Sequence, residues 1–152
     1  MNVLPSHPSS LALPKRTVIN ILYTQNILHD KFNEILKPFE ISAEQFNVLR
    51  ILRGQNGNPA NMCLIQERMI AKTSNTTRIV DKLLVKELVT REICSQNRRK
   101  MDVHITEKGI GLLLEIDPKV EQFEQQQVDN LSTNEAELLN ALLEKYRTQP
   151  LI

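Results

Sequence analysis

Apolar residues recur at helical spacing over most of the chain, and this pattern predicts a mainly α-helical protein. In the first predicted helix, residues 15–37, Ile21, Leu28 and Ile35 follow one another at intervals of seven. A stripe with this interval suits packing against another helix, including a helix of a second subunit. Pro38 ends the helix, because the residue before a proline is driven out of the α-helical region.

Side chains that cap helix N-termini mark where three further helices begin. Ser42 with Gln45, and Ser132 with Glu135, have the spacing of capping boxes, in which the serine accepts a hydrogen bond from the third helical residue. Thr106 precedes another apolar pattern, which runs to about residue 128. Each of these caps predicts a helix directly after it.

Two shorter helices, at about residues 63–70 and 76–86, are separated by a polar turn in the middle of the chain. Thr73 or Ser74 is the expected N-cap of the second of them. This second helix has two unlike faces. Thr76, Ile79, Val80 and Leu83 are expected on its inner face, and Asn75, Arg78 and Lys82 on its outer face.

After the second short helix the apolar positions change to the spacing of β-strands. Leu88–Cys94 and Met101–Ile105 are predicted strands. The polar segment between them ends in Arg98, Arg99 and Lys100 and contributes no core residue, so it is the expected turn of a β-hairpin. The predicted fold class is therefore mainly α with a small β-hairpin.

Composition narrows the class of protein further. The 152 residues suit a single domain, and an aromatic content of 4% favours an aliphatic helical core. No segment has the length of a transmembrane helix and the start of the chain lacks a signal-peptide pattern, so we expect a cytoplasmic protein without a membrane partner. Cys63 and Cys94 fit a reducing compartment and are expected to be inert packing residues, with a redox switch as the alternative.

Charge is distributed unevenly, although the formal net charge of the whole chain is only +1. From Arg68 to Lys100 there are nine basic and three acidic residues, whereas from Glu107 to the end there are four basic and nine acidic residues. A basic middle followed by an acidic segment indicates one face directed towards a polyanion. Two solvated surfaces of opposite sign would give the same pattern.

The second short helix and the hairpin together predict binding to double-stranded DNA. Short polar side chains at a helix N-terminus can reach base edges and phosphates. Arg78 and Lys82, one turn apart on the outer face, can neutralise the phosphate backbone. A cationic hairpin tip can enter an adjacent minor groove. Taken singly, these features also fit a capped surface helix and a solubilising turn, but their combination favours DNA.

Short motifs in this region resemble the MarR family of bacterial transcriptional regulators. Thr77–Leu83 is similar to the family's recognition-helix core, and Leu88–Arg91 followed by Asn97–Arg99 is similar to its wing. Ile105–Gly109 stands where the family has a Leu-Thr-x-x-Gly run. The resemblance is strongest over residues 41–109, and the flanking helices extend it to nearly the whole chain beyond the N-terminal arm.

The resemblance implies an obligate homodimer with a winged helix-turn-helix lobe in each subunit. After a flexible arm of residues 1–14, residues 15–152 would form one domain, with dimerisation helices in 15–40 and 107–152 and the DNA-binding lobe in 41–106. It also implies a pseudo-palindromic operator, repression released by a small-molecule effector or other signal, and Arg99 in the minor groove. The expected DNA-contact residues are Ser74, Asn75, Thr77, Arg78, Lys82, Arg98, Arg99 and Lys100.

Two residues depart from the family pattern. Asn97 replaces the wing aspartate and cannot form that residue's ion pair with a neighbouring arginine. Glu87 occupies the position of a glycine before the first wing strand. A residue other than glycine must avoid the left-handed backbone conformation there or adopt it at a cost in free energy.

Enzymatic activity, a cofactor and a metal site are not expected. His7, His29 and His104 are scattered, the four glycines form no phosphate-binding loop, and no Cys/His cluster has metal-ligand spacing. Tyr23, His29 and the surroundings of Phe46 are candidates for an effector pocket, but a place in the dimer core is favoured for each of them taken singly, so no ligand residue is assigned. The alternative function is a winged-helix module that binds another protein without sequence-specific DNA binding.

Overall fold

The chain is mainly α-helical with one small antiparallel sheet, as predicted. The structure, a computed structural model, describes residues 11–70, 75–94 and 101–148. Its elements are α1 (Leu13–Leu36), η1 (Lys37–Phe39), α2 (Ala43–Arg53), β1 (Ala60–Asn61), α3 (Met62–Arg68), α4 (Thr76–Val85), β2 (Val89–Ile93), β3 (Met101–Ile105), α5 (Glu107–Val128) and α6 (Thr133–Arg147). None of these helices combines the length and apolarity that crossing a membrane would require.

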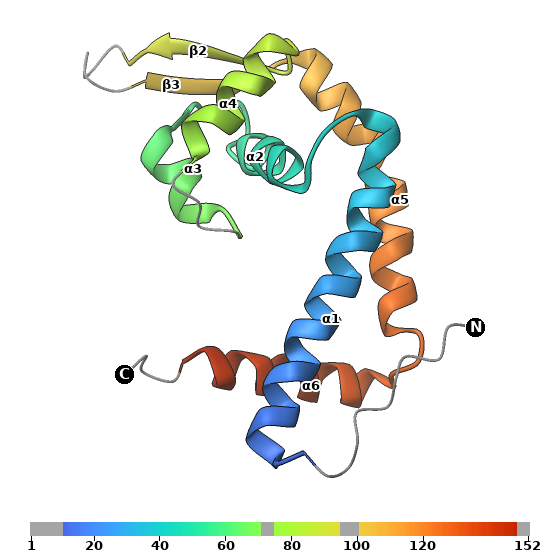
Figure 1. Ribbon diagram of the computed structural model, residues 1–152. Coiled ribbons are helices and arrows are strands. Elements are labelled where there is room, and N and C mark those ends of the chain that lie inside the picture. Colours follow the sequence, from blue (N-terminus) through green and yellow to red (C-terminus); the bar gives the residue numbers. More distant parts are fainter. Residues whose placement is uncertain (1–10, 71–74, 95–100, 149–152) are drawn as a thin grey trace.

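The elements form a lobe attached to a pair of long helices (Figure 1). The lobe contains α2, α3, α4 and the sheet. From it α1 and α5 run side by side, and α6 crosses near their far end. Helix α1 begins at Leu13, two residues before the expected start, and Pro14 lies in its first turn. Backbone N–H groups in the first turn have no helical acceptor, so proline, which lacks an N–H, is tolerated there.

The sheet has three strands in the order β1-β3-β2 and is larger than the predicted hairpin. Strands β2 and β3 pair as predicted, with Val89 opposite Ile105 and Ile93 opposite Met101. Strand β1 pairs with the other edge of β3 and was not predicted. It is only two residues long, too short to show an alternating apolar pattern.

Three of the predicted helix caps are confirmed. Ser42 and Ser132 form capping boxes, and Thr106 accepts a hydrogen bond from the Gly109 N–H. The predicted cap of α4 is wrong, because α4 begins at Thr76 and its N-cap is Asn75, whose side chain makes no capping hydrogen bond.

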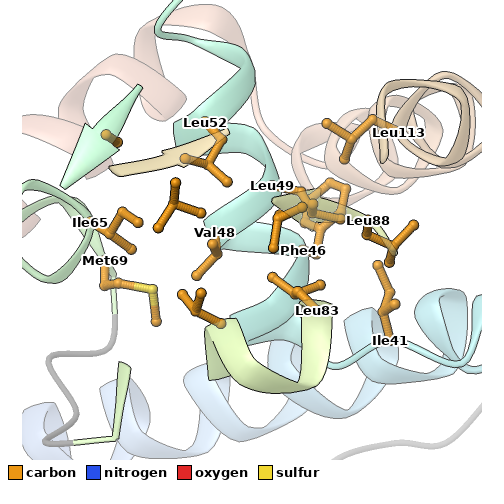
Figure 2. Close-up of a cluster of buried hydrophobic side chains, with 14 of the residues drawn as sticks. Ile41, Phe46, Val48, Leu49, Leu52, Ile65, Met69, Leu83, Leu88 and Leu113 are labelled. Carbon is orange, nitrogen blue, oxygen red and sulfur yellow. The ribbon is translucent and has the colours of Figure 1, made fainter. Parts of the chain in front are cut away.

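Helix α2 lies at the centre of the lobe's core. Figure 2 shows Val48, Leu49 and Leu52 of α2 surrounded by residues of α3, α4 and α5. Apolar burial of this kind is the main stabilising contribution to folding. The fully buried side chains around these three include Ile65, Val80, Leu83, Val103, Leu113 and Ile116.

Helix α5 passes very close to the segment that joins α4 to β2. A Cβ atom added at Gly109 would lie 2.4 Å from the Leu88 carbonyl oxygen and 2.8 Å from Cγ1 of Ile105. The Thr106 hydroxyl donates to the Glu87 carbonyl at 2.8 Å, and the Thr106 N–H donates to the Leu88 carbonyl at 3.1 Å. The Thr-x-x-Gly spacing therefore has a structural reason: threonine caps α5 and glycine permits its approach.

Helix α4 ends with a residue in the left-handed conformation. Glu87 has φ 59°, the Leu88 N–H donates to the Leu83 carbonyl at 3.0 Å, and the Glu87 N–H donates to the Leu84 carbonyl at 2.9 Å. This is the Schellman arrangement, in which glycine is the usual residue. Glu87 therefore adopts the strained conformation that its position demands.

We predict that Gly109→Ala lowers the free energy of unfolding by about 2–3 kcal/mol, because the backbone of Leu88 cannot move away cheaply. Gly111→Ala is the matched control. Apart from its own helix, no described atom lies within 4 Å of its added Cβ, so alanine should stabilise the helix by about 0.5–1 kcal/mol. Urea denaturation measures both, and equal effects of the two substitutions would contradict the close approach.

We predict that Glu87→Gly raises the free energy of unfolding by about 0.5–1 kcal/mol, because the left-handed strain disappears. The exposed ion pair of Glu87 with Lys108, at 3.0 Å, should contribute only a few tenths of a kcal/mol, roughly. Glu87→Ala removes the same ion pair and keeps the strain. The strain argument fails if the glycine variant is less stable than the alanine variant in urea.

Candidate nucleic-acid interface

Helix α4 has a buried face and an exposed polar face, as predicted. Thr76, Val80 and Leu83 are buried on the core side. The exposed polar side chains on the other faces are Asn75, Thr77, Arg78, Asp81 and Lys82, and the apolar Val85 at the end of the helix is exposed as well. The helix is therefore anchored by the lobe core while its first turn and its cations face outward.

The structure brings together half of the predicted DNA-contact residues. Asn75, Thr77, Arg78 and Lys82 lie within two turns of one helix. The other four lie outside the described residues, as does Asn97; they are Ser74, Arg98, Arg99 and Lys100. Their contribution to a DNA surface stays a prediction.

An ion pair that the sequence analysis missed joins α4 to the sheet. The Arg91 Nη1 atom of β2 lies 2.8 Å from Oδ1 of Asp81 on α4. The pair connects the exposed side of the helix to the first wing strand. None of the ion pairs among the described residues includes Arg78 or Lys82. Asp81 and Arg91 are of opposite charge and ten apart in sequence, but pairing them requires knowing how the turn after α4 folds back.

Lys82 lies in a mixed electrostatic environment. The pKa of Glu44, in the first turn of α2, is lowered mainly by a hydrogen bond from the Ser42 side chain and by a backbone hydrogen bond. The nearby Lys82 ammonium and the His29 side chain lower this pKa further. Helices α1, α2 and α4 thus place these charges near one another, and the Glu44 carboxylate is ionised at neutral pH.

The residues considered for an effector pocket do not gather at one cavity. Phe46 is buried in the core and packs edge-to-face on Phe32, with ring centroids 5.5 Å apart. Tyr23 and His29 are exposed positions on α1. An open groove of about 560 Å³ instead lies between α1 and α5. Its lining residues are Lys31, Glu34, Ile35, Pro38, Lys119, Gln122, Phe123, Gln126 and Gln127.

The two cysteines differ in environment. Cys63 is exposed on α3, and Cys94 is half-buried directly after β2. Both are free thiols. The expectation that Cys63 is a packing residue is therefore wrong, since its position on α3 faces away from the core. A redox role for either thiol stays an untested alternative.

Comparison with known proteins identifies the family. Residues 41–101 match the MarR family model. The chain is 30% identical over 118 residues to the HTH-type transcriptional regulator MhqR of Bacillus subtilis. The aligned segment covers 78% of this chain and 80% of MhqR.

Solved structures share the fold along most of the chain. A MarR mutant from E. coli complexed with operator DNA is similar with a TM-score of 0.76 and 24% identity, covering 93% of this chain and 99% of that one. The organohalide-sensing regulator RdhR in its 2,4-dichlorophenol-bound form is similar with a TM-score of 0.83 and 18% identity, covering 99% of this chain and 90% of that one. The winged-helix fold that the motifs predict is thereby confirmed, and the chain belongs to the MarR family of transcriptional regulators.

Proposed function

We propose that this regulator is a homodimeric repressor that binds a pseudo-palindromic operator through α4 and the wing. In this proposal residues 41–106 form the DNA-binding lobe, residues 15–40 and 107–152 carry the dimerisation helices, and the protein acts in the cytoplasm. The observation that carries the proposal is the outer face of α4, where Asn75, Thr77, Arg78 and Lys82 are all exposed.

The geometry of α4 supports a place in the major groove. An α-helix fits this groove, and residues near its N-terminus are those that reach base edges. Asn75 and Thr77 can donate to and accept from bases, whereas Arg78 and Lys82 can neutralise phosphates. We assign Ser74, Arg98, Arg99 and Lys100 to the same surface on the sequence motifs alone.

Unpartnered apolar surface supports the dimer. Helix α6 has no buried residue in a single chain, and Leu138 is 59% exposed. Other large apolar side chains exposed on α1 and α6 include Leu13, Val18, Leu22, Leu28, Leu139, Leu142 and Tyr146. Exposed apolar surface on this scale usually marks an interface. A twofold dimer would place its two recognition helices about 34 Å apart, one turn of DNA.

Two further observations support the mechanism. Three of the nine acidic residues of the C-terminal part lie on α6, which is remote from α4 (Figure 1), whereas the basic excess lies in residues 68–100. The structurally similar RdhR binds 2,4-dichlorophenol. A small-molecule signal that changes the spacing of the two lobes would release the operator from this chain.

We predict that Arg78→Ala and Lys82→Ala each weaken binding to an operator selected from random DNA. The logarithm of the association constant falls with the logarithm of the salt concentration, and each lost phosphate contact should make this negative slope shallower by about 0.9. Lys82→Ala should weaken selected and random duplexes alike, because phosphates carry no sequence information. Fluorescence anisotropy titrations at several salt concentrations measure both quantities.

Lys15→Ala is the matched control, because Lys15 is an exposed cation at the end of α1 that lies farthest from the lobe (Figure 1). It should leave affinity and salt slope unchanged. Wild-type affinity after combined substitution of Arg78 and Arg99 by alanine would refute the assigned surface. A wild-type protein that neither shifts genomic DNA nor binds heparin would instead support the protein-interaction module.

A further inference from the structure

Helix α5 is shared between the lobe and the long helix pair. Its N-terminal half contributes Leu113 and Ile116 to the buried core of the lobe. Its C-terminal half packs on α1, where the ring centroids of Phe123 and Phe32 are 6.0 Å apart. The angle between the lobe and the long helices therefore depends on how α5 is held between these halves.

An ion pair clamps α2 of the lobe to α5 at this place. Arg53, the last residue of α2, donates from both terminal nitrogens to the Asp117 carboxylate, and the Nη2–Oδ1 distance is 3.3 Å. The two side chains are only 34% and 26% exposed. A guanidinium fork that engages both carboxylate oxygens fixes relative orientation as well as distance.

The clamp lies beside a proline inside α5. Asp117 directly precedes Pro118, which lies inside the helix. Proline has no N–H, so the carbonyl of Leu114 loses its helical hydrogen bond, and proline rings bend helices. In Figure 1 the part of α5 beside the wing and the part beside α1 run in different directions.

Other contacts at this junction constrain orientation less. The Phe32–Phe46 contact between α1 and α2 is apolar and lacks the directionality of a bidentate ion pair. Lys86 donates to the carbonyl of Glu40, where the chain enters the lobe from α1. Lys108 pairs with Glu87, where the chain leaves the lobe into α5. Arg53–Asp117 instead joins segments 64 residues apart in sequence.

We propose that Arg53 and Asp117 are positioning residues that latch the turn of α5 just before the bend at Pro118 onto the end of α2, and thereby fix the angle at which the long helices leave the winged lobe. The latch is a property of one chain. Its consequence for DNA rests on the proposed function: in a dimer, the angle sets the spacing of the two α4 helices, so releasing the latch lowers operator affinity without altering any DNA-contact residue.

An intrachain distance measurement tests the latch without DNA. Cys63 in the lobe and an introduced Glu124→Cys on α5 beyond Pro118 are both exposed positions for spin labels, in a Cys94→Ser background. Labelled chains are mixed with excess unlabelled Cys63→Ser, Cys94→Ser chains, so that nearly every dimer that contains a labelled chain contains only one. Electron–electron double resonance then reports the distance between lobe and α5.

With the native latch, a single narrow distance distribution is expected. Arg53→Met and Asp117→Asn should each broaden or shift it, and exchanging the charges in Arg53→Asp/Asp117→Arg should restore it. Arg91→Met is the matched control, because it removes an Arg–Asp pair inside the lobe and should leave the distribution unchanged. Single variants with the native distribution, or a control with the same broadening, would overturn the proposal.

Operator affinity separates failure of the latch from failure of the proposed function. If only about one tenth of the dimers have the angle that fits the operator, operator affinity falls about tenfold, whereas affinity for an isolated half-site stays unchanged. Altered distances in a protein that binds no operator would support the latch and refute the DNA-binding proposal. Equal losses on operator and half-site would refute the latch as the cause.

Discussion

Burial of α2 inside the lobe is the constraint on which the rest of the structure depends. Its apolar side chains Val48, Leu49 and Leu52 are packed by α3, α4, β3 and α5. Helix α4 is too short to be stable alone, since isolated helices below about 12–15 residues are marginal in water. Its position therefore comes from packing on α2, and that packing turns the polar face of α4 outward.

The contacts around this core explain the family motifs physically. Thr106 and Gly109 fix the start of α5 against the end of α4, and Glu87 accepts a left-handed conformation so that β2 can turn back. The Asp81–Arg91 pair then joins α4 to β2. Residues of the family motifs thus hold α4, β2 and the start of α5 together, and the long helices orient the lobe as a unit.

Local features of this fold could be predicted from the sequence, and long-range ones could not. The capping box at Ser42 and the two faces of α4 depend on residues three or four apart, and both are confirmed. Strand β1 and the Arg53–Asp117 pair depend on where distant segments meet, which no local pattern encodes. The cap of α4 was misplaced because several adjacent polar residues have similar capping propensity.

Hydroxyl-radical footprinting on an operator selected from random DNA tests the central claim most directly. Two symmetric protected patches, centred about one helical turn apart on one face of the duplex, are the expected result. A single patch, or protection without twofold symmetry, would contradict the account of two outward-facing α4 helices on a dimer.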